Sequence, residues 1–416
     1  MIYQIIIGKG GLEMKIKLGV FFGGNSVEHE VSIITAIQAI ENMDKEKYDI
    51  IPIYIAKNNK MYCGELVGDI KNYKNINNLI EKSTQVTLAQ KGERVAIIKC
   101  EKKMFENVVY DYIDVAFPIV HGTNVEDGTL QGFLKMFNLP YVGCDIVSSA
   151  VGMDKYIFKC LLKENGLPVI DCKCFTVDQY NESQQSIVEV VEQNINYPVI
   201  VKPVNLGSSV GIKIAKNRAE FEDAVADAFR YAKKILVERA VTNLKEVNCS
   251  VIGDYELCEA SECEEPIKTD EILSFKDKYI SGEGKMGGAK SDNEKSMNAG
   301  VLKLPADISA ETRSKIQDLS KKTFKVLGCS GVVRIDYIID QDSNEIFVNE
   351  INTIPGSLSF HLWKATNLKY VDLLDKLINL ALKRNREEQN MTFSFESNIL
   401  AGYENGFCGS KGKLGK

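Results

Sequence analysis

The sequence of 416 residues has no apolar run that approaches the roughly 20 residues of a membrane-spanning helix. Its first residues include a short apolar stretch, but neither a basic segment nor a small-residue cleavage site accompanies it, so the pattern of a secretory signal is missing. The formal net charge of −6 argues against a broad nucleic-acid-binding surface. We therefore expect a cytoplasmic protein that contacts neither a membrane nor a nucleic acid.

Cysteine pairs with metal or redox spacing are also missing. The eleven cysteines are scattered, and no two of them form a C-x-x-C motif. Cys172 and Cys174 lie two residues apart, which would place both on one face of a strand. Small buried thiols in a reducing compartment are the better interpretation.

What the sequence does contain is the composition of an ordinary globular protein, with 44% hydrophobic and 26% charged residues. The length suffices for two or three domains. The changes of pattern along the chain predict an N-terminal extension over 1–13, an α/β domain over 14–147, a second region over 148–384 that contains a lid over 275–300, and a C-terminal tail over 385–416.

The first domain is predicted to contain a parallel sheet. Residues 15–24 (KIKLGVFFGG) are typical of a strand that ends in glycines, residues 26–43 carry apolar side chains at helical spacing, and residues 48–56 are typical of a second strand. A strand over 113–122 and a helix over 126–143 follow. The β-loop-α-β order predicts parallel pairing, with a glycine-rich turn at the N-terminus of the first helix.

The second half alternates between strand and helix patterns. We predict one helix over 148–169 and another over 218–234, followed by a strand over 235–241. Residues 275–300 are rich in Gly, Lys and Ser. A loop of this length inside a domain is usually functional, commonly as a lid.

Residues 199–214 (VIVKPVNLGSSVGIKI) place a lysine and a glycine-serine turn between two alternating runs. The spacing of a Walker loop is missing, and no helix signal follows directly. We predict a β-hairpin whose turn offers a cation and backbone N–H groups to phosphates. The residues concerned are Lys202, Gly207, Ser208 and Ser209. The alternative is an ordinary hairpin turn, for which Gly and Ser are equally suited.

Residues 331–352 predict a second hairpin, because the polar stretch DQDSN separates two alternating runs. With a short turn, Asp336 faces Glu350 and Arg334 faces Asn352, and all four side chains share one face. Two opposed carboxylates would repel, and a Mg²⁺ ion, which prefers such oxygen ligands, would remove the repulsion. Arg334 would offer a fork of donors to a phosphate or an oxyanion. The alternative is a solvated strand face with chance charges.

Together the two hairpins resemble an ATP-grasp site, in which ATP lies between two β-layers. Seven segments, in order, resemble the signatures of D-alanine–D-alanine ligases: GGNSVEHEVS (23–32), HGTNVEDGTLQG (121–132), YVGCDIVSSAVGMDK (141–155), VIVKPVNLGSSVG (199–211), DKY (277–279), RID (334–336) and NEINTIPG (349–356). The resemblance spans roughly residues 14–384. It implies an α/β fold, α+β in part, with an N-terminal parallel α/β domain followed by a two-lobed ATP-grasp unit. The small lobe of that unit would span 148–237 and the large lobe 238–384, with the lid over 275–300.

The resemblance implies a reaction in two steps. ATP phosphorylates the carboxylate of a first D-alanine, and the amine of a second D-alanine attacks the acyl phosphate through a tetrahedral intermediate. Because two anions must approach each other, cations have to surround them. Arg334 and the backbone N–H of Gly356 would stabilise the oxyanion.

For the nucleotide, the resemblance implies binding of ATP with Mg²⁺, for which Mn²⁺ can substitute. The metal would be held by Asp336, Glu350 and Asn352. Glu238 matches an adenine-binding glutamate, and Glu246 a ribose-binding one, although the spacing between these two is longer than we expect. The phosphates would meet Lys155, Lys202, Lys278 of the lid, and the turn residues Gly207, Ser208 and Ser209.

For the first D-alanine, Glu28 matches the anchor of the substrate ammonium and His121 a neighbour of its carboxylate. Ser208 and Tyr279 match partners that link Glu28 to the turn and to the lid. Each assignment has an ordinary alternative. Glu28 would cap the following helix, His121 would be a satisfied structural histidine, Lys155 a solvated helix lysine, and Tyr279 a packed aromatic residue.

Two departures from the family pattern affect the expectations. Val125 stands where we expect a glycine, and the segment after Gly356 is shorter than usual, so that either Ser359 or His361 replaces a serine that helps to bind the second substrate. D-Serine or D-lactate therefore stays open as the second substrate. A related ATP-grasp carboxylate–amine ligase and a non-catalytic nucleotide-binding module are further alternatives, and a homodimer is compatible with each.

Overall fold

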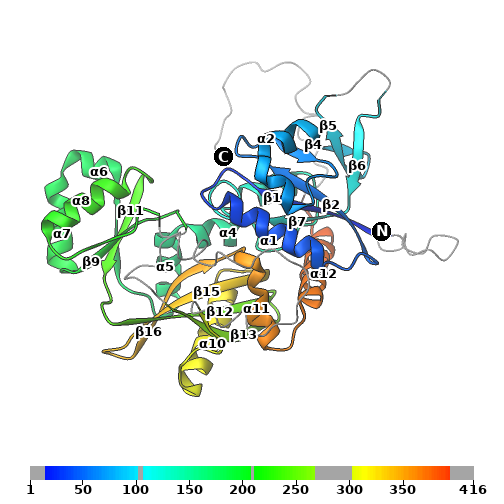
Figure 1. The fold of residues 1–416 in the computed structure, drawn as a ribbon. Coiled ribbons are helices and arrows are strands. Elements are labelled where there is room, and N and C mark those ends of the chain that lie inside the picture. The colour runs from blue at the N-terminus through cyan, green and yellow to red at the C-terminus, as the bar shows by residue number, and fades with distance from the viewer. Residues whose placement is uncertain (1–14, 102–105, 208–209, 268–301, 394–416) are drawn as a thin grey trace, which may run out of the picture.

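A computed structural model describes residues 15–101, 106–207, 210–267 and 302–393 of the chain. Three β-sheets follow one another along the sequence, and helices pack on each of them (Figure 1). This mixed α/β architecture confirms the predicted fold class. Within these ranges, no helix is both long and apolar enough to cross a membrane.

The N-terminal sheet has the strand order β6-β5-β4-β3-β2-β1-β7. Its parallel part confirms the prediction, because β1 (Ile16–Gly23) pairs in parallel with both β2 (Tyr48–Ile55) and β7 (Val115–Ile119). Helix α1 (His29–Asn42) connects β1 to β2. Every residue of β7 is buried, as expected for a parallel strand that helices cover, and Pro118 is tolerated there because β7 is an edge strand.

The same sheet continues through antiparallel strands in a region for which no element was predicted. These strands are β3 (Met61–Cys63), β4 (Thr84–Lys91), β5 (Arg94–Lys99) and β6 (Val109–Ile113). The short helices of the domain are η2 (Ile70–Asn75), α2 (Ile76–Lys82) and α3 (Thr129–Met136), the last of which occupies only part of the predicted range 126–143.

Residues 148–169, predicted as one helix, form two. Helix α4 (Ile146–Met153) ends at Asp154, and α5 (Lys155–Glu164) begins directly after it. The Asp154 carboxylate accepts a hydrogen bond of 3.1 Å from the backbone N–H of Tyr156, and so caps α5. The prediction was wrong because the apolar spacing continues across a break that a single capping residue produces.

The small lobe contains a sheet of order β10-β9-β11-β8, with its helices gathered on one side (Figure 1). The predicted hairpin is confirmed, because β9 (Val199–Pro203) pairs antiparallel with β10 (Lys213–Ala215). The helix predicted over 218–234 is shorter, since α8 ends at Ala228. The other elements are β8 (Cys172–Thr176), α6 (Val177–Glu182), α7 (Gln184–Asn194), α8 (Arg218–Ala228) and β11 (Lys234–Arg239).

The large lobe contains a sheet of order β14-β13-β12-β15-β16. Strands β15 (Gly331–Asp340) and β16 (Glu345–Asn352) form the second predicted hairpin, with Arg334 opposite Asn352 and Asp336 opposite Glu350, as predicted. The other elements are β12 (Leu244–Gly253), β13 (Cys258–Pro266), β14 (Leu302–Lys303), α10 (Ala310–Val326), η3 (Gly356–Ser359) and α11 (Phe360–Ala365).

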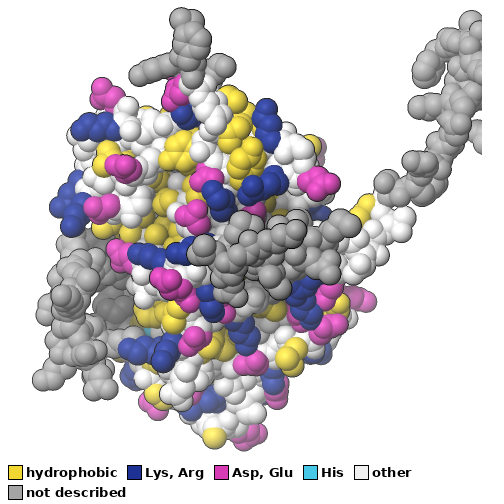
Figure 2. Space-filling view, turned by 90° about the vertical axis from the view of Figure 1, so that its right-hand side faces the viewer, with side chains coloured by type: hydrophobic (Ala, Val, Ile, Leu, Met, Phe, Trp, Pro, Cys, Tyr) yellow, Lys and Arg dark blue, Asp and Glu magenta, His cyan; other side chains and the backbone are white. Residues whose placement is uncertain are grey.

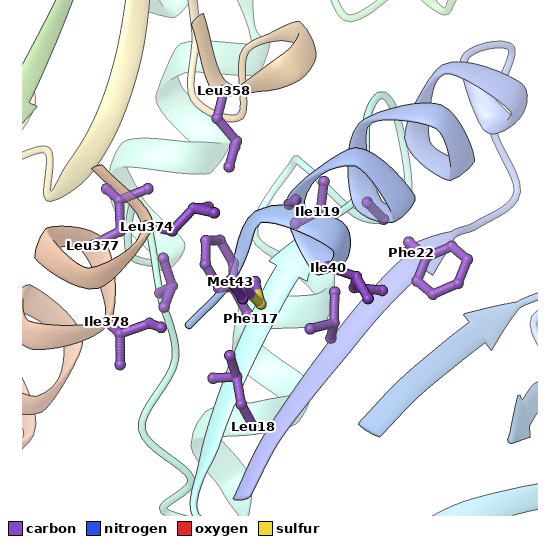
Figure 3. Close-up of a cluster of buried hydrophobic side chains, with 14 of the residues drawn as sticks. Leu18, Phe22, Ile40, Met43, Phe117, Ile119, Leu358, Leu374, Leu377 and Ile378 are labelled. Atoms are coloured by element: carbon purple, nitrogen blue, oxygen red, sulfur yellow. The ribbon is translucent and has the colours of Figure 1, made fainter. Parts of the chain in front are cut away.

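The last helix of the described residues, α12 (Tyr370–Gln389), returns to the N-terminal domain. Its Leu374, Leu377 and Ile378 belong to the same buried cluster as Leu18 of β1 (Figure 3). The predicted domain limits at 147, 237 and 384 fall inside α4, β11 and α12. As limits they stay predictions, and a division at loops would move each by a few residues.

Candidate active site

A cavity of about 350 Å³ lies where the three units meet. It contains the sequence-predicted site residues of all of them, as far as the structure describes these residues. They are Glu28, His121, Lys155, Lys202, Gly207, Glu238, Glu246, Arg334, Asp336, Glu350, Asn352 and Gly356. Ser208, Ser209, Lys278 and Tyr279 lie outside the described residues. Two other hollows have lysine and arginine side chains in their walls, but they share none of these twelve positions.

The hairpin of β15 and β16 places acidic and basic groups together on one wall of this cavity. The guanidinium of Arg334 donates two hydrogen bonds to Asp336, of 2.7 and 2.9 Å. The side-chain amide of Asn352 donates to the same carboxylate at 3.1 Å. Glu350 lies 3.5 Å from the ammonium of Lys155. Each of the two opposed carboxylates therefore has a cation beside it, which removes their mutual repulsion.

Lys155 reaches the cavity because α5 begins at that residue. Its backbone N–H donates to the carbonyl of Val204 (2.9 Å), and its ammonium donates to the carbonyl of Leu206 (2.8 Å). The side chain is buried. Lys155 is therefore fixed against the loop that follows β9 and is not a solvated helix lysine.

Lys202 of β9 and Glu238 of β11 lie on neighbouring strands of the small lobe, two positions apart in the register, where Lys202 pairs with Leu236 and Glu238 with Ile200. The Lys202 ammonium contacts one carboxylate oxygen of Glu238, and Lys159 of α5 contacts the other. All three side chains are buried. Burial would raise the pKa of Glu238, but the charges of the two lysines outweigh it and hold the pKa at about 2. Burial lowers the pKa of Lys159; the charge of Glu238 acts in the opposite direction, and the nearby charge of Lys202 lowers the pKa further.

Glu28 occupies the N-cap position of α1, but its side chain makes no capping hydrogen bond. The carboxylate points instead toward two glycines of other segments. A Cβ atom at Gly207 would lie 3.0 Å from Oε2 of Glu28, and one at Gly122 would lie 3.2 Å from it. Glycine at both positions allows two loops to approach the carboxylate closely. Glu28 therefore joins the first helix to the turn of the small lobe.

His121 is buried, and both of its ring nitrogens have partners. Nδ1 lies 2.7 Å from the carbonyl of Ile354, and Nε2 lies 3.2 Å from the hydroxyl of Thr35. Burial lowers the pKa of His121, with the charge of Glu28 acting in the opposite direction. A neutral ring that donates through Nδ1 and accepts at Nε2 satisfies both contacts. His121 is thus a satisfied structural histidine that also lines the cavity.

Glu126 is a residue whose role the sequence did not reveal. Its buried carboxylate accepts hydrogen bonds from the backbone N–H groups of Gly122 (3.0 Å) and Ile354 (2.9 Å), and one from the hydroxyl of Thr353 (3.3 Å). Burial, together with the charge of Glu28, raises the pKa of Glu126 to about 7. Glu126 ties the loop after β7 to the segment after β16, and both segments line the cavity.

The segment after Gly356 separates the two candidates for the missing serine. Ser359 is fully buried, and its hydroxyl has no hydrogen-bond partner within the described residues. His361 lines the cavity, and its Nε2 lies 2.6 Å from a carboxylate oxygen of Glu264. Burial would raise the pKa of Glu264, but the hydrogen bond and charge of His361 lower it. Of the two, only His361 can meet a substrate in the cavity.

Val125, which stands in the HGTNVEDG segment where we expected a glycine, packs against the glycine turn after β1. A Cβ atom at Gly24, which has a φ of +92°, would lie 3.3 Å from a methyl carbon of Val125. The valine side chain is buried. It therefore fills space beside the turn without entering the cavity lining.

The chain matches two protein families along most of its length. Residues 17–144 match the D-ala D-ala ligase N-terminus, and residues 161–379 match the D-ala D-ala ligase C-terminus. The D-alanine–D-alanine ligase of Thermosipho melanesiensis is 38% identical over 386 residues, which are 92% of this chain and 98% of the relative. That of Caldicellulosiruptor bescii is 36% identical over 392 residues, 92% of this chain and 99% of the relative.

Solved structures agree with these matches. The D-alanine–D-alanine ligase of Coxiella burnetii superimposes with a TM-score of 0.74 at 30% identity, over 90% of this chain and 96% of its own. VanG, a D-Ala:D-Ser ligase of Enterococcus faecalis, superimposes with a TM-score of 0.71 at 31% identity, over 88% of this chain and all of its own. Together with the sequence matches, these likenesses establish that the chain belongs to the D-alanine–D-alanine ligase family.

Proposed function

We propose that this protein joins two D-alanine molecules to D-alanyl-D-alanine, with conversion of ATP to ADP, as a step of peptidoglycan precursor synthesis. The observation that carries the proposal is the meeting of Glu28 from the N-terminal domain, Lys202 from the small lobe and Arg334 from the large lobe around one cavity. A site for an amino acid and a nucleotide needs an anion for the ammonium and cations for the phosphates.

The chain's own residues divide into three tasks. Glu28 holds the ammonium of the first D-alanine, Lys155 and Lys202 contact the phosphates of ATP, and Glu238 and Glu246 contact its adenosine. Arg334 and the backbone N–H of Gly356 stabilise the charge that develops on the reacting carboxylate. His121 and Glu126 hold the loops that surround the first substrate.

The oxygen donors of the second hairpin fit a hard divalent cation. Asp336, Glu350 and Asn352 would hold Mg²⁺, which when bound would neutralise charge on the phosphates. Within the described part of the chain, no group of three or more His, Cys, Asp or Glu side chains could hold a metal ion. The amide oxygen of Asn352 would be the third donor, once the amide had turned from its present contact with Asp336.

The experiment is a coupled assay of ADP release with D-alanine alone, and then with D-serine or D-lactate added. We expect D-alanine alone to support turnover and D-alanyl-D-alanine to accumulate. If turnover begins only after D-serine or D-lactate is added, that compound, and not D-alanine, is the second substrate. ADP release that none of these compounds stimulates would refute the proposal.

A further inference from the structure

Lys159 is a buried cation that the proposed reaction does not use. It lies one turn after Lys155 on α5, and residues four apart share one face of a helix. Its side chain is 2% exposed, and its ammonium contacts the carboxylate oxygen of Glu238 that Lys202 does not contact. Glu238 lines the cavity, whereas Lys159 lies behind it.

Lys202 has two competing partners in this arrangement. Its ammonium contacts Glu238 and lies 3.3 Å from the side-chain oxygen of Asn349. A nucleotide phosphate, as proposed above, would compete with Glu238 and Asn349 for the three N–H donors of the Lys202 ammonium. A carboxylate as buried as Glu238, left without a cation, would be strongly unfavourable. Without another partner for Glu238, the phosphate would therefore have to draw Lys202 out of a closed ion pair.

We propose that Lys159 is a positioning residue that keeps Glu238 paired, so that Lys202 is available to the phosphates of the nucleotide. Two ammonium groups share one carboxylate, and the cluster therefore carries one positive charge in excess. That excess charge attracts the phosphates. The inference rests on the proposed function, because it takes the phosphate contact of Lys202 from there.

The test is the affinity of the full-length protein for ATP, ADP and adenosine, measured by calorimetry or by competition. In Lys159→Met, Glu238 has Lys202 as its one remaining cation, so Lys202 is less available to the phosphates. We expect ATP and ADP to bind about ten- to a hundredfold more weakly, the effect of losing a charge-assisted contact. Adenosine, which carries no phosphate, should bind as before. The KM for ATP should rise while both constants for D-alanine stay unchanged.

A matched control is available one turn further along the same helix. The side chain of Lys163 is 69% exposed and pairs with Asp171 on the surface. Lys163→Met removes the same charge from α5 without touching Glu238, so it should leave all three affinities unchanged. If Lys159→Met does not fold, Lys159→Gln, which keeps a donor but removes the charge, permits the same comparison.

The combination with Lys202→Met decides whether Lys159 acts through Lys202. If it does, the double variant binds ATP no more weakly than Lys202→Met alone. If the losses of ATP affinity in the two single variants add up in the double variant, the proposal is overturned. It is also overturned if adenosine affinity falls as much as ATP affinity in Lys159→Met, because Lys159 would then shape the adenosine site. If Lys202→Met itself binds ATP normally, the phosphate role of Lys202 is refuted together with the proposal. If Lys202→Met binds ATP more weakly but Lys159→Met binds it normally, the proposal for Lys159 is refuted and the phosphate role of Lys202 stands.

Discussion

Asp336 and Glu350 lie directly opposite each other on β15 and β16, and each carboxylate has its own cation. Arg334 contacts Asp336, and Lys155 lies 3.5 Å from Glu350. The two cations come from different lobes, since Lys155 belongs to α5. The acidic pair is therefore a point at which the two lobes meet, and it is sensitive to any change of charge.

Replacement of Glu350 by glutamine tests the metal assignment. The variant keeps the shape of the side chain but removes one of two carboxylates that would hold Mg²⁺, so we expect ADP formation to fall by about a hundredfold or more. The activity should depend on a higher Mg²⁺ concentration than in the wild type. Glu345→Gln, on the exposed end of the same strand, is the control. Normal activity of Glu350→Gln at ordinary Mg²⁺ would show that this pair does not hold the metal.

Replacement of Glu28 by glutamine tests the site of the first D-alanine. The loss of a buried charge-assisted contact costs about 1.5–3 kcal/mol, so KM for the first D-alanine should rise roughly ten- to a hundredfold. The KM for ATP should change little, because the proposed ATP contacts lie on other elements. Glu30→Gln removes an exposed carboxylate from the same helix and should be neutral. A variant that weakens ATP and spares both D-alanine constants would make Glu28 a nucleotide ligand.

His361 and Ser359 give opposite predictions for the second substrate. His361 lines the cavity, so His361→Ala should raise the constant for the second D-alanine by about tenfold and leave the first unchanged. Ser359→Ala should leave both constants unchanged, because the buried hydroxyl makes no hydrogen bond within the described residues. Two-site kinetics on both variants would measure this. The reverse pattern would assign the substrate contact to Ser359.

Glu126 makes stability depend on pH in a direction that is unusual for a carboxylate. Its pKa is raised from 4.5 to about 7 in the folded protein, so the folded state keeps a proton that the unfolded state has lost between these values. Stability is therefore lost as the pH rises from about 4.5 to about 7. The shift corresponds to about 3 kcal/mol.

Urea unfolding of the wild type and of Glu126→Gln at pH 5 and pH 8 measures this contribution. The glutamine variant cannot ionise, so between pH 5 and pH 8 it should lose about 2.5 kcal/mol less than the wild type, because part of the contribution is already lost at pH 5. An identical pH dependence of the two proteins would contradict the assignment.

The register of the second hairpin was predictable because its cause is local. Alternation fixes which side chains share a face, and the polar stretch fixes the turn, so the pairing of Asp336 with Glu350 followed from the sequence. The break between α4 and α5 also had a local cause in Asp154, but the continuous apolar spacing concealed it.

Figure 2 shows basic and acidic side chains interspersed over the described part of one face of the molecule. This mixture agrees with the small net charge that the composition gives.

The contacts of Glu126 and Lys159 were not predictable in the same way. Glu126 meets Ile354, which is 228 residues away in the sequence, and Lys159 meets Glu238 at a distance of 79 residues. Neither partner follows from spacing or composition. Such pairs depend on how the domains pack, and a single sequence carries no direct signal of that packing.

The return of α12 to the N-terminal domain has a consequence for synthesis of the chain. Leu374 and Leu377 complete the apolar cluster around β1, and the ribosome adds them only after the strands of all three sheets. The domain made first must therefore stay partly uncovered until a helix that follows both lobes has been made. We expect a nascent chain stopped before Tyr370 to bind a hydrophobic dye and to recruit chaperones, and release of the full-length chain to abolish both.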